Sequence, residues 1–293
     1  MTIFRPAHES DLKQMYEVWY QTEVLDSPDP PAPGTPPSYL WHVLQTGILW
    51  VAEHNGEVLA FAGAITRGTI TFLTDLFVQP AQQSGQLGKT LLRSVLPQDD
   101  LTHCTVSSSD PRALALYIRA GMRPQWPYFA LRMEKPAREW PLATTVEIIE
   151  AEPGDPTFVE WDSQISGRPR PVEHAYWVRE QRAVPLWFRQ HEQIVGYGYV
   201  RLGAGSLWHP HACVLGPIGV KAQEDATACV MAAVNWALQR TEELSIDVPG
   251  PHPCLALLLE KGFRITYVDT FVSTAALSFF DARCYIPSGG DLF

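Results

Sequence analysis

The chain has 293 residues, a length typical of two domains, and 46% of them are hydrophobic, which excludes a mostly disordered protein. Its 22 basic and 32 acidic residues give a formal net charge of −10, which argues against a nucleic-acid partner. We expect no membrane span, because no apolar run reaches ~20 residues, and no signal peptide is evident. Five scattered cysteines without a CxxC pair indicate reduced thiols, a cytoplasmic location and no metal site.

Hydrophobic periodicity in the first half predicts strand, two helices, three strands, helix, strand, helix and strand. Six prolines between Ser27 and Pro37 predict a stiff loop without regular structure. The expected elements are a strand at Ile3–Pro6, a helix from Ser10, a helix at Tyr39–Leu44 capped by Ser38, strands at Ile48–Ala52, Val58–Ile65 and Thr69–Val78, a helix at Ser84–Leu96, a strand at Thr102–Ser107, a helix from Pro111 capped by Asp110, and a strand at Gln125–Met133.

The same order of elements returns after residues 136–144, which we interpret as a linker because they contain Pro136 and Pro141 and lack periodicity. The second set comprises strands at Val146–Ala151, Leu186–Arg189, Ile194–Arg201, Ser206–Val220, Ser245–Val248 and Arg264–Thr274, helices at Phe158–Ile165, Glu173–Glu180, Asp225–Leu238 (capped by Asp225) and Pro253–Lys261, and a stiff loop at Gly167–Pro171.

A direct match between the halves supports duplication of one fold. Leu114–Arg123 aligns with Leu255–Arg264, and both segments carry apolar helical spacing followed by a glycine. We therefore predict an N-terminal domain at residues 1–135 and a C-terminal domain at residues 145–293. The composition of the last residues, Tyr285–Phe293, is not that of a disordered tail, so we expect them to dock on the protein, and a position near the cleft is one option.

One loop in the first half has the composition of a phosphate-binding turn. Gly85 and Gly88 lie between the strand that ends at Val78 and an amphipathic helix. The N-terminus of a helix offers backbone N–H groups and a partial positive charge, and glycine lets a ligand approach the backbone closely. Lys89 and Arg93 add positive charge. Taken alone, the pattern is equally typical of an ordinary strand-to-helix turn.

A second motif supports the interpretation of this loop as a phosphate-binding turn. Asp110 is followed seven residues later by Tyr117 and then by Gly121-Met122. Together with the loop and the element order, these residues resemble the GNAT superfamily of acetyl-CoA-dependent N-acetyltransferases. The family's Gln/Arg-x-x-Gly-x-Gly/Ala loop is matched here by Gln83, Gln86 and Gly88, with Gln86 in place of the central glycine and Gly85 beside it. The family's Asn, Tyr and Gly-Phe are matched by Asp110, Tyr117 and Gly121-Met122.

The resemblance implies the fold and the cofactor. The fold is α/β with a mixed, mostly antiparallel sheet, a splayed strand pair and flanking helices, present as two GNAT-like domains in tandem. The implied cofactor is acetyl-CoA as co-substrate, its pyrophosphate on the main-chain amides of the loop and its thioester oxygen on an N–H near Val78. The implied cofactor-binding residues are Leu76, Phe77, Val78, Gln83, Ser84, Gly85, Gln86, Leu87, Gly88, Lys89 and Asp110.

Two side chains are candidates for acid and base. In the resemblance Tyr117 protonates the leaving thiolate, while the alternative is a core aromatic residue on a packed helix. Asp75 stands near the end of its strand, where it could take a proton from an ammonium group, directly or through water. The alternative for Asp75 is a strand-end carboxylate that solvates a loop.

The second half lacks these groups. Leu258 aligns with Tyr117, Pro217 aligns with Asp75, and the loop aligns with residues 220–226, which contain no glycine and two acidic residues. Acidic side chains at a helix N-terminus repel a pyrophosphate, so we expect no coenzyme A there but a role in shaping the acceptor site or supporting the first domain. Arg168 and Arg170 either pair with an anionic substrate group or form a solvent-exposed basic loop.

These observations predict an acetyl-CoA-dependent N-acetyltransferase that transfers the acetyl group to a primary amine by direct attack in the N-terminal domain. The acceptor, a small molecule or a peptide, is left open, and so is the choice between monomer and homodimer. The aromatics near the proline-rich loop suit a partly apolar amine, a peptide N-terminus or an antibiotic; they are Trp19, Tyr39, Trp41 and Trp126. The alternative function is a non-catalytic acyl-CoA-binding regulatory or scaffolding protein, suggested by Gln86 and by the uncertain base.

Overall fold

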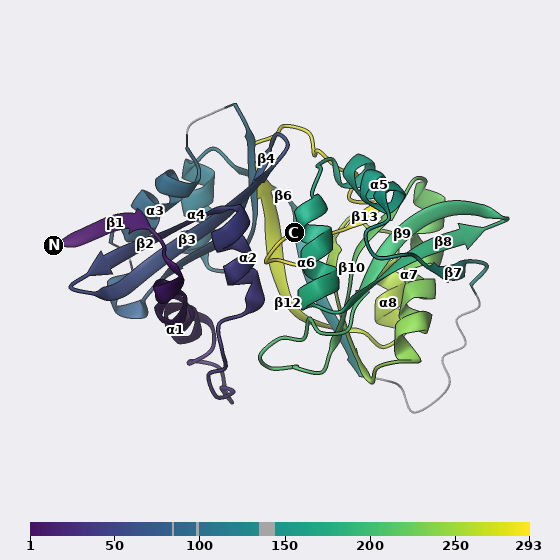
Figure 1. The fold of residues 1–293 in the computed structure, drawn as a ribbon, viewed down its shortest axis with the longest axis horizontal. Helices are drawn as coiled ribbons and strands as arrows, with labels where there is room; N and C mark the ends of the chain where they lie inside the picture. The colour runs from purple at the N-terminus through teal and green to yellow at the C-terminus, as the bar shows by residue number, and fades with distance from the viewer. Residues whose placement is uncertain (84, 98–99, 135–143) are drawn as a thin grey trace. The chain divides into compact units, whose positions relative to one another are not determined.

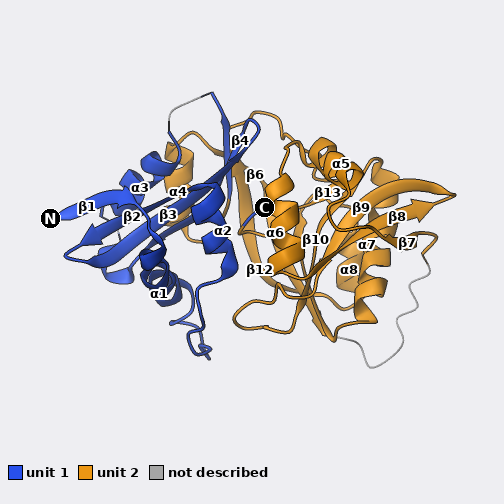
Figure 2. Cartoon of the chain, in the orientation of Figure 1, with its two compact units in different colours: residues 1–105, 292 blue, residues 106–291, 293 orange. Residues whose placement is uncertain are grey.

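The computed structural model describes residues 1–83, 85–97, 100–134 and 144–293. They form two compact units, residues 1–105 with Leu292 (unit 1) and residues 106–291 with Phe293 (unit 2), coloured separately in Figure 2. The predicted linker at 136–144 lies outside the described residues except for Thr144. The predicted domains follow the sequence repeat, whereas the two compact units divide after Thr105. The predicted domain limits therefore stay a prediction.

Unit 1 is built on a sheet in the order β1-β2-β3-β4-β5 (Figure 1), with antiparallel pairing up to β4 and parallel pairing between β4 and β5. The asparagine-glycine turn at Asn55-Gly56 joins β2 to β3. The elements are β1 (Thr2–Pro6), a 3₁₀ turn (Glu9–Asp11), α1 (Leu12–Glu23), α2 (Ser38–Thr46), β2 (Ile48–His54), β3 (Glu57–Arg67), β4 (Ile70–Val78), a second 3₁₀ turn (Pro80–Gln82), α3 (Leu87–Val95) and β5 (Thr102–Ser107), whose last two residues belong to unit 2.

Unit 2 has strands in the order β12-β6-β11-β10-β9-β8-β7, with β13 paired to β10. Its elements are α4 (Pro111–Arg119), β6 (Arg123–Glu134), β7 (Glu147–Glu150), α5 (Pro156–Ser166), α6 (Pro171–Glu180), β8 (Ala183–Gln190), β9 (Gln193–Arg201), β10 (Cys213–Val220), α7 (Gln223–Leu238), β11 (Glu243–Pro249), α8 (Leu255–Glu260), β12 (Arg264–Ser273) and β13 (Tyr285–Ile286).

The order of elements from β1 to β6 is repeated from β7 to β12, which confirms the duplicated fold. One strand departs from a simple head-to-tail duplication. β6 ends the first repeat, yet it pairs antiparallel with both β11 and β12, which end the second repeat. The last strand of the first repeat is therefore an inner strand of the unit 2 sheet.

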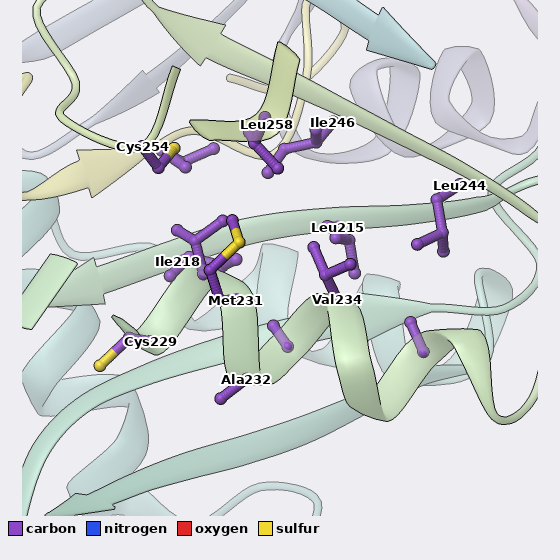
Figure 3. Close-up of a cluster of buried hydrophobic side chains, with 14 of the residues drawn as sticks. Leu215, Ile218, Cys229, Met231, Ala232, Val234, Leu244, Ile246, Cys254 and Leu258 are labelled. Atoms are coloured by element: carbon purple, nitrogen blue, oxygen red, sulfur yellow. The ribbon is translucent and has the colours of Figure 1, made fainter. Parts of the chain in front are cut away.

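The core of unit 2 forms where α7 covers the sheet. Figure 3 shows side chains of α7, among them Met231 and Val234, close to side chains of β10 and β11. Leu258, the counterpart of Tyr117, is fully buried in the same cluster. An aliphatic side chain at this position adds apolar burial and no proton-transfer chemistry, as the alignment predicts.

Several predicted boundaries were wrong. Ser38 is the first helical residue of α2 and Pro37 is its N-cap, whereas Asp225 lies in the first turn of α7 after the N-cap Ala222. A carboxylate is stabilising anywhere in the first turn of a helix, so the sequence pattern did not distinguish the N-cap from the positions that follow it. Residues 206–212 form turns rather than the start of β10, because Pro210 cannot donate to a strand ladder.

Among the described helices, none combines the length and apolar character needed to cross a membrane.

Candidate active site

β4 and β5 separate part of the way along their length. Ile70–Phe72 pair in parallel with Thr102–Cys104, and the Thr105 hydroxyl donates to the Leu73 carbonyl at 2.8 Å. No further pair between these strands occurs among the described residues. A bulge at Thr74 bends β4 at this point, since Asp75 and Leu73 pair with adjacent residues of β3. The splayed strand pair implied by the GNAT resemblance is therefore present, and beyond Leu73 one edge of β4 has no strand partner in the described part of the chain.

The open edge of β4 presents backbone groups. The Gln79 N–H donates to the Leu59 carbonyl of β3 at 2.9 Å. Because successive N–H groups along a strand point to opposite edges, the N–H of Val78 points away from β3. The side chain of Gln83 reaches the same edge, where its Nε2 donates to the Val78 carbonyl at 3.2 Å. The side chain of Gln83 thus connects the start of the loop to the end of the strand.

The loop leads into a helix N-terminus suited to an anion. α3 begins at Leu87 with Gln86 as its N-cap, three residues later than predicted, and its first turn has no acidic residue. Gly88 and Lys89 lie in that turn, whose N–H groups have no acceptor within the helix. Arg93 lies in the last turn. Ser84, also predicted to bind cofactor, lies outside the described residues.

Gln86 fits the loop without the glycine that the family pattern has there. Its φ of −88° and ψ of −1° belong to the right-handed helical region, which every L-residue adopts. The substitution therefore introduces no backbone strain. A Cβ added to Gly85 would lie 3.3 Å from the Gln82 carbonyl, so a larger residue at position 85 would crowd the loop.

Asp75 is a buried carboxylate beside the open edge of β4. Its side chain and backbone are together only 3% exposed, and the Tyr39 hydroxyl donates to its Oδ1 at 2.7 Å. Gly63 of β3 makes room for it, because a Cβ there would lie 2.6 Å from Thr74 Oγ1 and 3.2 Å from Asp75 Oδ2. This burial argues against the alternative in which Asp75 solvates a loop. The sequence marks Tyr39 only as an aromatic residue near the proline-rich loop, because a contact between α2 and β4 has no local signal.

The proline-rich loop of unit 1 has no helix or strand, as predicted. Two tyrosines of α1 hold it: the Tyr20 hydroxyl donates to the Pro31 carbonyl at 2.6 Å, and the Gly34 N–H donates to the Tyr16 hydroxyl at 2.9 Å. The prolines restrict the backbone and the hydrogen bonds fix its position on α1, so the loop presents a defined surface rather than a flexible one.

Tyr117 lies on α4 in unit 2, and Asp110 is the N-cap of that helix. The Asp110 carboxylate caps the helix by accepting from the Arg112 N–H at 2.8 Å, which confirms the predicted cap. The Arg112 side chain also bonds this carboxylate, and that hydrogen bond, opposed by some desolvation, lowers the pKa of Asp110. Tyr117 is 6% exposed, and Gly121 after the helix has a φ of +99°, as a glycine C-terminus predicts.

The second repeat has no equivalent set of groups. Pro217 stands in place of Asp75, Leu258 in place of Tyr117, and Glu224 and Asp225 occupy the first turn of α7. Desolvation and the charge of Glu224 raise the pKa of Asp225. Among the described residues, no cluster of three or more His, Cys, Asp or Glu is arranged to hold a metal ion, and the cysteines form no disulfide.

Arg168 and Arg170 are both buried, 3% and 1% exposed, so the prediction of a solvent-exposed basic loop was wrong. Arg170 forms two 2.7 Å hydrogen bonds with the carboxylate of Asp162, which is fully buried on α5. Proline-flanked arginines with an aspartate eight residues earlier carry no recognised motif, which is why sequence reasoning missed this ion pair.

Comparisons with known proteins find one family match in the first repeat and similar folds over almost the whole chain. The model of the acetyltransferase (GNAT) family matches residues 11–122, a range that contains the forked strands, the α3 loop, Asp75 and Tyr117. The match to the GNAT family therefore covers residues 11–122, most of the first repeat. The family uses acetyl-CoA as its co-substrate. No curated protein matches the chain.

Solved structures share the fold over almost the whole chain at low identity. A protein from Pyrococcus horikoshii assigned as an acetyltransferase is 16% identical with a TM-score of 0.74, covering 100% of this chain and 96% of its own. A GCN5-related N-acetyltransferase from Sphaerobacter thermophilus is 18% identical with a TM-score of 0.60, covering 93% and 95%. A tandem GNAT protein from the clavulanic acid biosynthesis pathway is 14% identical with a TM-score of 0.62, covering 95% and 100%. The fold is that of tandem GNAT proteins.

Proposed function

We propose that the protein transfers an acetyl group from acetyl-CoA to a primary amine, and that the chemistry takes place in the first repeat. The observation that carries the proposal is the open edge of β4, which continues through Gln83 into the acid-free N-terminus of α3 and has the buried carboxylate of Asp75 beside it. The second repeat keeps the fold but has neither a glycine loop nor an equivalent acid.

The residues present suit acetyl-CoA. The first-turn N–H groups of α3 and Lys89 favour a pyrophosphate, because the helix dipole and the lysine charge act in the same direction. The N–H of Val78 points to the open edge, where it can donate to the thioester oxygen as negative charge develops there. A preorganised donor of this kind contributes about 3 kcal/mol in known enzymes.

The proton transfers are assigned to Asp75 and Tyr117. When bound, acetyl-CoA supplies the acetyl group as a thioester, whose C–S bond breaks as the amine nitrogen bonds to the carbonyl carbon. Asp75 takes a proton from the ammonium group, directly or through water, with Tyr39 holding its Oδ1. Tyr117 gives its proton to the departing sulfur, as the family resemblance implies. The nitrogen releases its second excess proton to solvent as the amide forms, and Tyr117 regains a proton from solvent.

A calorimetric titration with acetyl-CoA, followed by a thiol-release assay over a panel of amines, tests the proposal. We expect binding, and release that depends on the amine. Binding without release by any amine would favour a non-catalytic acyl-CoA-binding protein instead. The undistorted backbone at Gln86 supports the proposal.

Tyr117→Phe is expected to lower kcat by about 10²-fold or more, because a general acid is lost, while the Kd for acetyl-CoA stays nearly unchanged. Steady-state kinetics and calorimetry measure the two quantities. Tyr267→Phe is the matched control: Tyr267 is 55% exposed on β12 and should turn over at the wild-type rate. Turnover by Tyr117→Phe at the wild-type rate would show that Tyr117 is not the acid.

A further inference from the structure

The second repeat also contains a forked strand pair, and the fork is filled by the end of the chain. β10 pairs with β11 in parallel only at Cys213–Leu215, as β4 does with β5 at its first three residues. One edge of β10 is taken by β9. On the other edge, where β11 has separated, β10 pairs antiparallel with β13 through Ile218 and Gly219 (Figure 1). The Val220 N–H extends this ladder by donating to the Cys284 carbonyl at 3.0 Å.

The bulge of β10 is shaped for this segment. β10 has its bulge at Gly216-Pro217, where β4 has one at Thr74. Gly216 has a φ of +124°, and a Cβ there would lie 2.6 Å from the Pro287 carbonyl. The glycine therefore allows the C-terminal segment to approach the strand more closely than a residue with a side chain would.

Three arginines bind the backbone of the segment. Arg201 of β9 donates to the Ser288 carbonyl and also to Gln181 Oε1 at 2.8 Å. Arg168 and Arg170 both donate to the Phe293 carbonyl, Arg170 at 2.6 Å. Arg170 also contacts the Tyr285 hydroxyl. Burying three guanidinium groups is costly, so their shared orientation toward backbone oxygens indicates a site built for an extended peptide.

Aromatic side chains hold the two ends of the segment. The Phe293 ring stacks on Phe271 with 5.0 Å between centroids and 4° between planes, and the Arg168 guanidinium lies 4.8 Å from the Phe293 ring centre. Phe280 packs edge-on against both Phe293 and Tyr285. Tyr285 and Phe293 are completely buried. They are anchors of the kind that dominate peptide recognition.

We propose that the fork of the second repeat is a peptide-binding groove whose ligand is the chain's own segment, residues 284–293. The segment adds a strand to β10, and its two buried aromatics fix the register, as in recognition by β-strand addition. The groove corresponds to the edge of β4 that, under the proposed function, receives acetyl-CoA. The second repeat therefore takes a peptide where the first repeat takes the cofactor, and the chain binds one equivalent of acetyl-CoA.

To test the proposal, the chain is cleaved between β12 and the segment after the full chain has folded. A protease recognition sequence placed at 275–278, where Leu277 is 85% exposed, allows cleavage between β12 and the segment. We expect the 279–293 fragment to stay bound through gel filtration and to be released by moderate urea. A labelled synthetic peptide of residues 279–293 should then rebind saturably in fluorescence anisotropy. Loss of the fragment at the first gel filtration, with an unchanged Tm, would overturn the proposal.

Peptide variants test the anchor. The Phe293→Ala peptide should bind at least about tenfold more weakly, since it loses the aromatic stack and the arginine contact. The Gly290→Ala peptide is the matched control and should bind within about twofold, because no atom lies within 4 Å of a Cβ at Gly290. Equal binding by the two variants would contradict the assignment of Phe293 as an anchor.

If the protein unfolds once the 279–293 fragment has been removed, a measurement on the intact chain tests the proposal instead. Hydrogen exchange at Val220 and Ile286 should be slow and unaffected by saturating acetyl-CoA, with a calorimetric stoichiometry of one. Two equivalents of acetyl-CoA, or faster exchange at these amides when it is added, would overturn the proposal. Failure of acetyl-CoA to bind at all would refute the proposed function while leaving the fragment and peptide results to decide on the groove.

Discussion

Arg170→Ala is expected to lower the free energy of unfolding by about 3–5 kcal/mol, the range for removing one partner of a buried ion pair. The side chains of Arg170 and Asp162 are 1% and 0% exposed. Asp162 accepts two hydrogen bonds from Arg170, one from the Tyr197 hydroxyl at 2.5 Å and one from the His174 ring at 3.0 Å. Without the guanidinium, a carboxylate remains buried without its counter-charge, and the groove loses a donor to Phe293.

Urea unfolding of the full chain measures this loss. Arg179→Ala is the matched control, because Arg179 pairs with Glu180 at 2.7 Å but its side chain is 72% exposed. Exposed pairs contribute about 0–1 kcal/mol, so this variant should remain close to wild type. A loss below about 1 kcal/mol in Arg170→Ala would mean that water or a neighbouring group compensates the Asp162 charge.

The pH dependence follows from the pKa of Asp162. Burial alone would raise that pKa, but the charge and hydrogen bonds of Arg170, with the bond from His174, hold it well below its ordinary value. A carboxylate with a lowered pKa contributes stability above its unfolded pKa, about 3.9, and loses it only as pH falls through the folded value. The stability difference between wild type and Asp162→Asn should therefore be constant from pH 7 to about pH 5 and shrink in stronger acid.

Asp75→Asn is expected to lower kcat/KM for the amine by about 10²–10⁴-fold, the usual contribution of a general base. Asparagine keeps the size of the side chain and an oxygen that can accept from Tyr39, so the local fold should survive. The KM for acetyl-CoA should change little.

Two further variants separate catalysis from structure. Tyr39→Phe keeps the ring but removes the hydrogen bond to Asp75, so kcat should fall less than in Asp75→Asn. Asp26→Asn, at an exposed turn of unit 1, should leave both kinetics and stability unchanged. An Asp75→Asn enzyme with wild-type kcat/KM would mean that a water chain alone deprotonates the amine.

Much of the fold could be predicted from local pattern. Glycines and prolines mark turns and helix ends, and apolar spacing separates helices from strands, which is why the repeat and the cap at Asp110 were predicted correctly. The loop before α3 was located for the same reason. Its helix begins at Leu87 rather than Ser84 because the 3₁₀ turn at Pro80–Gln82 and the residues after it carry the chain from β4 to the helix.

The missed features depend on contacts between distant residues. β13 has two ladder residues, Tyr285 and Ile286, too few for a periodic signal, and exists because β10 offers an open edge. The contact of Tyr39 with Asp75 joins residues 36 positions apart. The burial of Arg170 depends on Asp162 and on the end of the chain together. No local propensity reports such arrangements.

The position of β6 has a consequence for how the protein is made. β6 is complete when synthesis reaches Glu134, but the strands that flank it, β11 and β12, are complete only when the chain has grown to Ser273. Until then both edges of β6 lack their final neighbours, and unpaired strand edges invite association with other chains. If the gene were truncated between the two repeats, both edges of β6 would stay without their neighbours. Expression of the first repeat alone should therefore give insoluble protein, even though it encodes every residue assigned to acetyl transfer.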